Sequence, residues 1–416
     1  MMNIKERFSR IPSWGWLALA AGLRLTFALK LGERFYQTDE GGFFQAGLNF
    51  ARLGVIGTSS QKLALPPVPT VFFGYLLRWG GERKLAIRLG QALLGAAIAG
   101  MIGRMTARLT GSQRAGRLAL ALSAVYPFFI YYGGMILSET LYVAAVTAGL
   151  WLLCEALGED SAPSRAAGAG FLLALAALSR AEGAPIALVI WAIVAVSRRL
   201  PWRSLVLGVL CWALPLSLWC ARNKAATGSF ALDLHGGMTM LHGSLLFDYN
   251  EIDTSEAQKA VETMPFYQAA ANLGGAEKNG AYLRQAFVFM RENPRKTLGQ
   301  WARKFVNFWR FYPRPEKVFL ENDYSHPSAG LSRSALVAIS LLFEPALILL
   351  GMAGLWGLKD RWRELFPLGL FILGSTAIHM VSVSQMRYRL AVMPILIMGA
   401  CFFAAERLGL GQSRKR

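Results

Sequence analysis

The segment SALVAISLLFEPALILLGMAGLWG, residues 334–357, decides the fold class of this chain. A helix needs about 20 apolar residues to cross the hydrocarbon core of a bilayer, and this run is long enough. The composition of the whole chain agrees, because 54% of its 416 residues are hydrophobic and only 17% are charged. Soluble domains carry about 25% charged residues, and a soluble chain this apolar would expose patches that drive aggregation. The sequence therefore predicts an all-α integral membrane protein.

Apolar runs of similar length recur along the chain and predict about ten membrane-spanning helices. The expected spans are 14–31, 85–106, 116–132, 136–157, 165–179, 183–197, 203–221, 334–357, 365–383 and 389–405. The first run is interpreted as an uncleaved span and not as a signal peptide, because Arg24 interrupts it and no clear small-residue cleavage site is present.

The distribution of basic residues predicts how these spans are oriented. Lys and Arg cluster at Lys5–Arg10, Arg104–Arg117, Arg198–Arg203, Lys359–Arg363 and Arg414–Arg416. Basic residues accumulate in cytoplasmic connections, and all five clusters fall on one side if the spans are numbered as above. We therefore expect a multi-pass protein of the plasma (inner) membrane with both termini in the cytoplasm.

This topology divides the chain into three parts. Residues 1–221 form an N-terminal transmembrane catalytic module whose first outer loop is 32–84, and residues 334–416 form the C-terminal transmembrane helices. The segment 222–333 is a larger outer loop whose mixed aromatic and basic residues predict amphipathic helices on the membrane surface. Within the first loop, the apolar stretch Leu63–Trp79 is expected to be a re-entrant or interfacial helix, because a full span there would reverse the side of Arg104–Arg117.

Several functional classes lack support in the sequence. The net charge of +19 is spread in short clusters between apolar runs, which argues for contact with membrane lipids and against nucleic-acid binding. The four cysteines form no CxxC pair, and the four histidines have no metal-binding spacing. No phosphate-binding glycine loop, HExxH or serine-hydrolase order is present. No cofactor is certain, although adjacent acids leave a divalent cation open.

Ionisable residues at the ends of spans are the candidates for chemistry, because charge at membrane depth is costly and is usually kept for function. Asp39 and Glu40, followed by two glycines, can act as a general base; the competing interpretation is that Asp39 caps the following helix. Glu139 has the same two interpretations. Arg180 and Glu182 form either a site or an internal ion pair, and Arg222 is either a ligand-binding residue or an interfacial anchor.

Arg387, Tyr388 and Arg389 stand at the outer end of the last span, where basic residues are disfavoured. A phosphate is the natural partner of a guanidinium there, so we expect both arginines to hold an anionic ligand. Under the predicted topology all the candidate residues fall on the outer face. Acids suited to a base and arginines suited to a phosphate on one face predict an enzyme centre.

The order of these motifs resembles a known family. Asp39-Glu40 is followed by Leu65-Pro66-Pro67, Ala86-Ile87-Arg88-Leu89, Leu137-Ser138-Glu139-Thr140, Ser179-Arg180-Ala181-Glu182-Gly183, Arg222-Asn223 and Met386-Arg387-Tyr388-Arg389. This order is similar to that of the GT-C membrane glycosyltransferases of the protein O-mannosyltransferase and aminoarabinose-transferase type. The resemblance covers most of residues 14–400 and is weakest across 240–330.

The resemblance implies a hexosyl or pentosyl transferase of the cell envelope with a polyprenyl-phosphate-linked sugar as donor. It implies catalysis at the outer (periplasmic or extracellular) face, with Asp39 at the acceptor and Glu40 beside it. It also implies that Arg387, Arg389 and Arg180 hold the lipid phosphate. No folded domain is evident after the last span, so acceptor recognition would fall to 222–333 or to the surface helices.

Two other functional classes remain open at this point. A transporter or flippase of lipid-linked saccharides would share the many spans and the basic phosphate-binding residues. It would more often show internal repeats, and none is convincing here. A non-catalytic membrane scaffold would not need acids and arginines clustered on one face. Sugar transfer from a purified polyprenyl-phosphate sugar would favour the enzyme, and transport without transfer would favour the flippase.

The predicted topology can be tested by cysteine accessibility. An impermeant thiol reagent applied to the outer face should label Met290→Cys directly, and should label Arg108→Cys only after the inner face is opened. The physical reason is the positive-inside bias around Arg104–Arg117. Labelling of position 290 only after the inner face is opened would place the whole candidate site on the other side.

Overall fold

A computed structural model describes residues 11–37, 39–56, 65–158, 162–245, 261–312 and 333–407, all of which form helices or their connections. The N-terminal helices are α2 (Ser13–Leu31), α3 (Glu40–Leu53), α4 (Pro67–Gly80), α5 (Lys84–Thr110), α6 (Gln113–Val125), α7 (Pro127–Gly134), α8 (Glu139–Leu157), α9 (Pro163–Ser179), α10 (Gly183–Ser197) and α11 (Trp202–Thr227). The remainder are α12 (Gly236–Leu245), α14 (Pro265–Ala271), α15 (Gly275–Glu292), α16 (Pro294–Phe308), α18 (Arg333–Gly357), η2 (Lys359–Arg361), α19 (Trp362–Val381), η3 (Met386–Ala391) and α20 (Met393–Arg407). The clusters Lys5–Arg10 and Arg414–Arg416 and the residue His326 lie outside the described residues.

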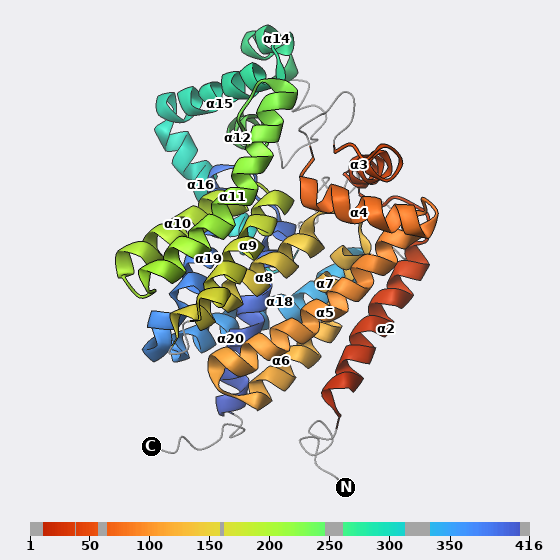
Figure 1. Ribbon diagram of the computed structural model, residues 1–416, viewed down its shortest axis with the longest axis vertical. Coiled ribbons are helices and arrows are strands. Elements are labelled where there is room, and N and C mark those ends of the chain that lie inside the picture. Colours follow the sequence, from red (N-terminus) through yellow and green to blue (C-terminus); the bar gives the residue numbers. More distant parts are fainter. Residues whose placement is uncertain are drawn as a thin grey trace.

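The long helices pack into one bundle (Figure 1). α5 packs against α2, α6 and α8, α9 packs against α8 and α11, and α18 and α6 pack against α20. Small residues allow the closest approaches: a Cβ added at Gly354 would lie 1.8 Å from the carbonyl oxygen of Gly399. The backbones of α18 and α20 therefore touch, as is usual where helices associate in a membrane.

Five helical stretches among the described residues are long and apolar enough to cross a membrane: α5, α8, α11, α18 and η2 with α19. The pair α6 and α7, bent by 49° at Tyr126, makes a sixth if it is one span. The other predicted spans correspond to α2, α9, α10 and α20, which are helical but fall short in length or apolarity. The chain is thus an integral membrane protein, and the count of about ten spans remains a prediction.

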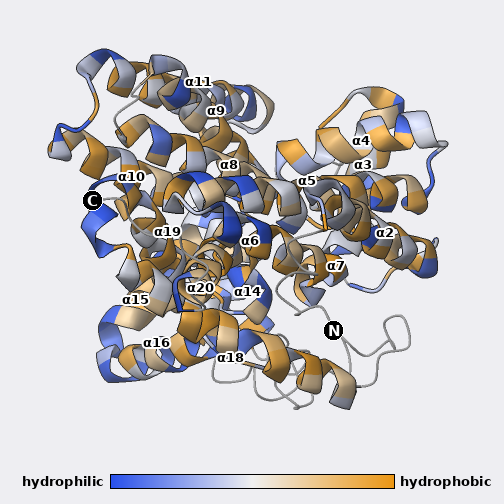
Figure 2. Ribbon diagram, turned by 90° about the horizontal axis from the view of Figure 1, so that it is seen from below, coloured by the Kyte–Doolittle hydropathy of each residue, from blue (hydrophilic) through white to orange (hydrophobic). Residues whose placement is uncertain are grey.

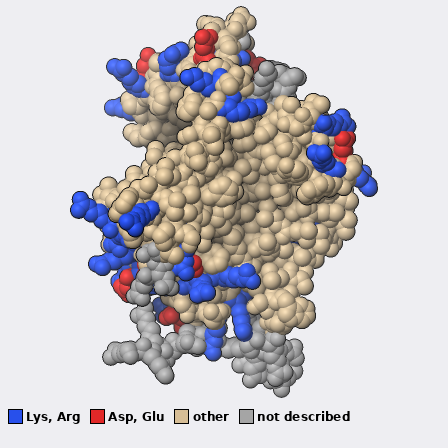
Figure 3. Space-filling view, viewed as in Figure 1, with Lys and Arg blue, Asp and Glu red and all other residues tan. Residues whose placement is uncertain are grey.

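The outward faces of the bundle are apolar in the way that lipid contact requires. On α11, Leu210, Leu214 and Leu218 are each more than half exposed and follow one another at one-turn spacing. α18 exposes Leu342 and Trp356 in the same way, and its ribbon is mostly hydrophobic in Figure 2. Figure 3 shows Lys and Arg gathered at the upper end, at the right edge and at the lower left of one face, with a broad uncharged surface between them. Lipid chains would cover such a surface.

The segment that follows α11 supplies a small helical cluster at one end of the bundle. α12, α14 and α15 share a core of Leu241, Val261, Ala270 and Tyr282, and α16 connects it to α19. In Figure 1 this cluster lies at the end opposite to the start of α2 and the end of α20. α15 and α16 are helices with exposed apolar and basic residues together, including Phe305, Val306 and Arg303. Their placement on a membrane surface remains a prediction.

The expected re-entrant or interfacial helix corresponds to α4, which begins after Pro66 and is 14 residues long. It packs against α3 and its Trp79 is 79% exposed. The length is too short for a span. The domain boundary expected at residue 221 falls inside α11, which continues to Thr227.

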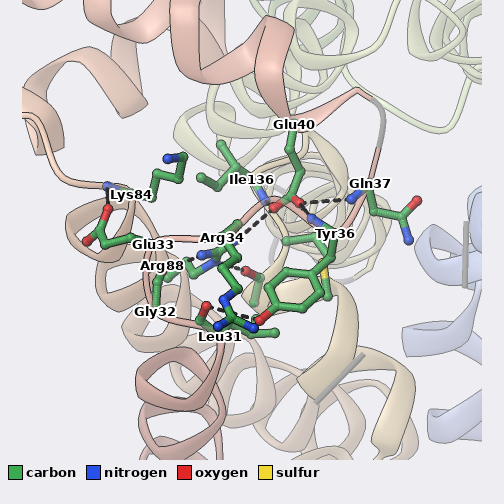
Figure 4. Close-up of polar contacts among 12 residues, drawn as sticks. Leu31, Gly32, Glu33, Arg34, Tyr36, Gln37, Glu40, Lys84, Arg88 and Ile136 are labelled. Carbon is green, nitrogen blue, oxygen red and sulfur yellow. Dashed lines mark hydrogen bonds and ion pairs between the residues drawn. The ribbon is translucent and has the colours of Figure 1, made fainter. Parts of the chain in front are cut away.

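A buried ion pair joins the first loop to the centre of the bundle (Figure 4). Arg88 on α5 and Glu40 at the start of α3 lie 3.0 Å apart, and both side chains are fully buried. Arg88 also donates to the carbonyl oxygens of Gly32, Arg34 and Gly134. This one guanidinium therefore ties the end of α2, the first loop and the end of α7 together.

The carboxylate of Glu40 is equally engaged. One oxygen accepts hydrogen bonds from the backbone N–H groups of Tyr36 and Gln37, and the other accepts from the N–H of Ile136 and from Arg88. A buried carboxylate is stable only when it is paired and hydrogen-bonded in this way. Glu40 thus fixes the first loop against the turn between α7 and α8.

Replacing Glu40 by alanine should destabilise the protein strongly. The change leaves the guanidinium of Arg88 buried without its carboxylate, and breaking a buried pair costs about 3–5 kcal/mol. Thermal unfolding of the detergent-purified protein would measure the effect. The matched control is Glu82→Ala, which breaks the exposed pair with Arg52 and should change the midpoint little. Equal midpoints for the two variants would contradict the anchoring role of Glu40.

Candidate functional site

Four separate segments bring charged side chains together at one place in the fold. They are the start of α3 with Asp39, the start of α8 with Glu139, the turn between α9 and α10 with Arg180 and Glu182, and η3 with Arg387. The resulting ion pairs form a continuous chain across the site. We call these five residues, together with Tyr388 and His379, the charged cluster.

Asp39 forms the accessible end of the charged cluster. Its Oδ2 accepts a hydrogen bond from Nη2 of Arg387 at 3.1 Å. It occupies the N-cap position of α3, yet its side chain makes no capping hydrogen bond. Its side chain is 52% exposed, and a Cβ added at the neighbouring Gly41 or Gly42 would meet no atom within 4 Å. The carboxylate is therefore open to a reactant, and capping does not account for it.

Glu139 links the two arginines of the charged cluster. Its Oε1 lies 3.1 Å from Nη1 of Arg180 and 3.8 Å from Nε of Arg387, and the side chain is almost fully buried. Arg180 also donates to the hydroxyl of Ser138 at 3.4 Å. The second oxygen of Glu139 has no hydrogen-bond partner and lies at a cavity of about 20 Å³ lined by Tyr132 and Thr140 among others. That volume is enough for one water molecule.

Arg180, Glu182 and His379 continue the chain into the protein. Nε of Arg180 donates to Oε1 of Glu182 at 3.0 Å, and Nε2 of His379 lies 3.6 Å from the other oxygen of that carboxylate. Burial raises the pKa of Glu182, but Arg180 and His379 outweigh this effect and hold the pKa well below its usual range. Glu182 therefore stays ionised, and the expected internal ion pair with Arg180 is present.

The aromatic ring of Tyr388 packs against the guanidinium groups of both Arg180 and Arg387. Its ring stacks on His379 at 4.6 Å, and the guanidinium carbons of Arg180 and Arg387 lie 4.8 and 5.4 Å from its centre. His379 in turn stacks on Phe308 of α16 at 5.5 Å. Cation–π contact of this kind orients a guanidinium without using its hydrogen-bond donors. The donors of both arginines stay directed toward carboxylates and any ligand.

Three of the candidate residues lie outside the charged cluster. Glu40 is the buried anchor described above, with no exposed surface for a reactant. Arg222 donates to the carbonyl of Ile56 and to Asn223 near the end of α11. Arg389 is 1% exposed and pairs with Glu344. The structure thus brings together Asp39, Glu139, Arg180, Glu182, Arg387 and Tyr388, and it gives Glu40 and Arg389 structural contacts.

Arg389 holds η3 in place. It donates to Glu344 on α18 and to the carbonyls of Phe308 and Arg310, while Glu344 also accepts from the hydroxyl of Tyr126. A buried acid and arginine with these partners are satisfied from several sides. This arrangement fixes the backbone from which Arg387 and Tyr388 project.

A second set of contacts holds the end of α19 and the connection between α19 and η3 in place. Lys304 on α16 is buried and donates to the carbonyl of Val381. Asn307 donates to the carbonyl of Ser384, whose hydroxyl donates back to the carbonyl of Lys304. The helical cluster that follows α11 is thereby bonded directly to the segment carrying Arg387.

His379 and Glu344 are the residues that sequence reasoning missed. His379 is isolated in the sequence, and its partners Glu182, Phe308 and Tyr388 come from other segments, so no sequence pattern indicates it. Glu344 is an acid within the apolar run 334–357. Because charge at membrane depth is costly, its position alone could have indicated a functional or paired residue. Arg24 and Arg88 carried the same signal: Arg24 donates to the carbonyls of Ser123 and Ala124 at the bend between α6 and α7, and Arg88 binds Glu40.

The chemistry that this arrangement supports is recognition of an anion beside a carboxylate. Two arginines that share one buried acid offer guanidinium groups to a phosphate, and an exposed aspartate can accept a proton from a hydroxyl or an amine. Among the described residues no group of three or more His, Cys, Asp or Glu side chains is placed to hold a metal ion.

Comparison with known proteins shows which families and folds this chain resembles. Residues 65–219 match the sequence model of the dolichyl-phosphate-mannose-protein mannosyltransferase family. The solved structure of the archaeal oligosaccharyltransferase AglB from Archaeoglobus fulgidus superimposes with a TM-score of 0.53 at 15% identity, over 95% of this chain and 51% of that protein. The aminoarabinose transferase ArnT from Cupriavidus metallidurans gives a TM-score of 0.42 at 17% identity, over 92% of this chain and 78% of that one. No curated protein sequence matches the chain.

The superposition on the archaeal enzyme includes nearly all of this chain, which spans about half the length of that enzyme. Together with the match of residues 65–219 to the mannosyltransferase model, this shared fold confirms the predicted resemblance to the GT-C membrane glycosyltransferases. At 15% identity the likeness establishes the fold, and the activity has to be argued from the charged cluster.

The two neighbouring arginines should respond differently to substitution. Arg389→Ala leaves Glu344 buried without its partner, so the free energy of unfolding should fall by about 3–5 kcal/mol. Arg387→Ala removes a partner from the exposed Asp39, while Glu139 keeps Arg180, so it should destabilise much less. Thermal unfolding in detergent would compare them. Loss of ligand binding without loss of stability is therefore expected for Arg387→Ala, and similar unfolding midpoints for the two variants would refute this distinction.

Proposed function

We propose that this chain is a membrane glycosyltransferase that moves a sugar from a polyprenyl-phosphate-sugar donor to an acceptor at the outer face of the plasma membrane. The observation that carries the proposal is the convergence of Asp39, Glu139, Arg180 and Arg387 from four distant segments. Sugar transfer from a phosphate leaving group needs a base for the acceptor and positive charge for the phosphate, and an exposed acid next to two arginines supplies both. The family match over residues 65–219 supports the same chemistry.

Arg387 and Arg180 are proposed to bind the phosphate of the donor. Attack at the anomeric carbon breaks its bond to the phosphate oxygen, and the electron pair leaves with the polyprenyl phosphate. Positioned guanidinium groups stabilise that developing negative charge. The solved structure of the archaeal oligosaccharyltransferase contains a dolichol-phosphate, which supports a lipid-linked donor for a chain with the same fold.

Asp39 is proposed to be the general base. It accepts the proton of an acceptor hydroxyl or amine as the acceptor oxygen or nitrogen forms its bond to the anomeric carbon. Its exposure and the open space at Gly41 and Gly42 leave room for the acceptor. Glu139 and Glu182 are proposed to position Arg180 and Arg387, because their carboxylates are buried among them.

The outer-face assignment rests on charge distribution. The turn between α5 and α6, with Arg108 and Arg114, lies at the end of the bundle where α2 begins (Figure 1). The helices α12, α14, α15 and α16 lie at the opposite end, and α16 packs against η3. The positive-inside rule assigns the first end to the cytoplasm, so the charged cluster belongs to the outer half of the protein.

Asp39→Asn tests the base. Asparagine cannot take up a proton, so the rate of sugar transfer should fall by roughly a hundredfold or more. Because the Asp39 side chain is half exposed and makes no capping hydrogen bond, the amount of protein in the membrane should not change. Purified protein in liposomes, supplied with a polyprenyl-phosphate sugar and candidate hydroxyl and amine acceptors, would give the rate.

Glu82→Gln is the matched control for this measurement, because it removes one carboxylate from an exposed ion pair outside the charged cluster. Transfer by this variant should equal that of the natural chain. Normal transfer by Asp39→Asn would exclude Asp39 as the base. Movement of the donor across the liposome membrane without any transfer would replace the enzyme by a flippase.

A further inference from the structure

Among the described residues, two carboxylates of different character lie within ion-pair distance of the Arg387 guanidinium. Glu139 lies on its inner side, 3.8 Å from Nε, with a side chain that is 6% exposed. Asp39 lies on its outer side, 3.1 Å from Nη2, with a side chain that is 52% exposed. Arg387 itself is 12% exposed, and the donor that Asp39 contacts, Nη2, is paired with the more exposed of the two carboxylates.

The two partners differ in how firmly they are held. Glu139 also pairs with Arg180 and begins a long buried helix, so it cannot leave without uncovering two buried charges. Asp39 precedes α3, and its side chain makes no capping hydrogen bond. Exposed ion pairs contribute little free energy. The outer carboxylate can therefore be exchanged, and the inner one cannot.

We propose that Asp39 and the phosphate of the lipid donor compete for the outer side of Arg387, so that donor binding releases Asp39. The proposal rests on the proposed function and specifies how its site is regulated. An arginine binds a phosphate through its guanidinium N–H donors, and the Nη2 donor that now contacts Asp39 is one that a bound phosphate would use. Glu139 stays in place and keeps Arg387 oriented throughout the exchange.

The exchange means that Arg387 binds the donor phosphate before Asp39 acts as the base. While Asp39 is paired with Arg387, its carboxylate is engaged by a cation and the phosphate site is filled by an internal anion. When the donor phosphate takes its place, the same event fills the leaving-group site and frees the base. The acceptor then meets an unpaired carboxylate only when a donor is present. Binding should therefore be productive in the order donor first and acceptor second.

The competition has a consequence that a plain catalytic base would not have. Asp39→Asn removes the competing charge, so donor affinity should rise while turnover falls. The gain should match the small strength of an exposed ion pair, which corresponds to roughly a two- to fivefold lower Kd. A base without this contact would lose turnover at constant affinity, and a residue that helps to hold the donor would lose affinity.

Binding of undecaprenyl phosphate to the purified full-length protein in detergent would test this, with undecaprenol as the ligand that lacks the phosphate. The proteins compared are the natural chain, Asp39→Asn, Arg387→Gln and the double variant, each checked for an unchanged unfolding midpoint. We expect tighter binding by Asp39→Asn and weaker binding by Arg387→Gln. In the Arg387→Gln variant the Asp39→Asn change should not increase the affinity for undecaprenyl phosphate, because the guanidinium for which the two anions compete is absent.

The control Glu82→Gln removes the same charge from an exposed pair elsewhere and should leave the Kd unchanged. An unchanged or higher Kd for Asp39→Asn would overturn the competition, and so would a gain that persists without Arg387, since that would be a long-range charge effect. If sugar transfer is intact in the natural chain while either result is found, the proposed function stands and only the exchange fails. If the natural chain does not distinguish undecaprenyl phosphate from undecaprenol, both fail together.

Discussion

The arrangement of the site depends on the buried pair of Arg88 and Glu40. Arg88 projects from a long central helix and collects three carbonyl groups from the end of α2, the first loop and the end of α7. Glu40 accepts hydrogen bonds from backbone N–H groups of the first loop and of the turn before α8. Both side chains are fully buried, and buried polar groups are kept only where they are hydrogen-bonded, so the pair fixes the positions of both backbones. Asp39 and Glu139 each follow directly from a backbone segment held in this way.

A second buried pair plays the same part for the C-terminal side of the site. Arg389 and Glu344 fix η3 against α18, with Tyr126 at the bend between α6 and α7 as the third partner. The charged cluster therefore lies between two internal ion pairs that have no accessible surface. Removing one partner of such a buried pair is costly. The two pairs therefore hold the neighbouring loop ends so that their side chains point in fixed directions.

The helical cluster formed by α12 to α16 is joined to the catalytic side of the proposed enzyme by specific polar contacts. Lys304 and Asn307 bond the chain just before η3, and Phe308 stacks on His379 beneath Tyr388. The segment 222–333, expected to recognise the acceptor, is thus bonded directly to the chain that carries Arg387, the residue proposed to bind the donor. The same contacts explain why His379, isolated in the sequence, belongs to the site.

The sequence by itself determined the class of protein, because long apolar runs with few charges have no stable place outside a bilayer. It also identified most members of the charged cluster, because charge at the end of a span is costly and needs a reason. It could not choose between neighbours. Asp39 and Glu40 differ by about 100° around a helix, and Arg387 and Arg389 by about 240° around a 3₁₀ helix. Only the packing of distant helices decided which of each pair faces the site and which is buried as its anchor.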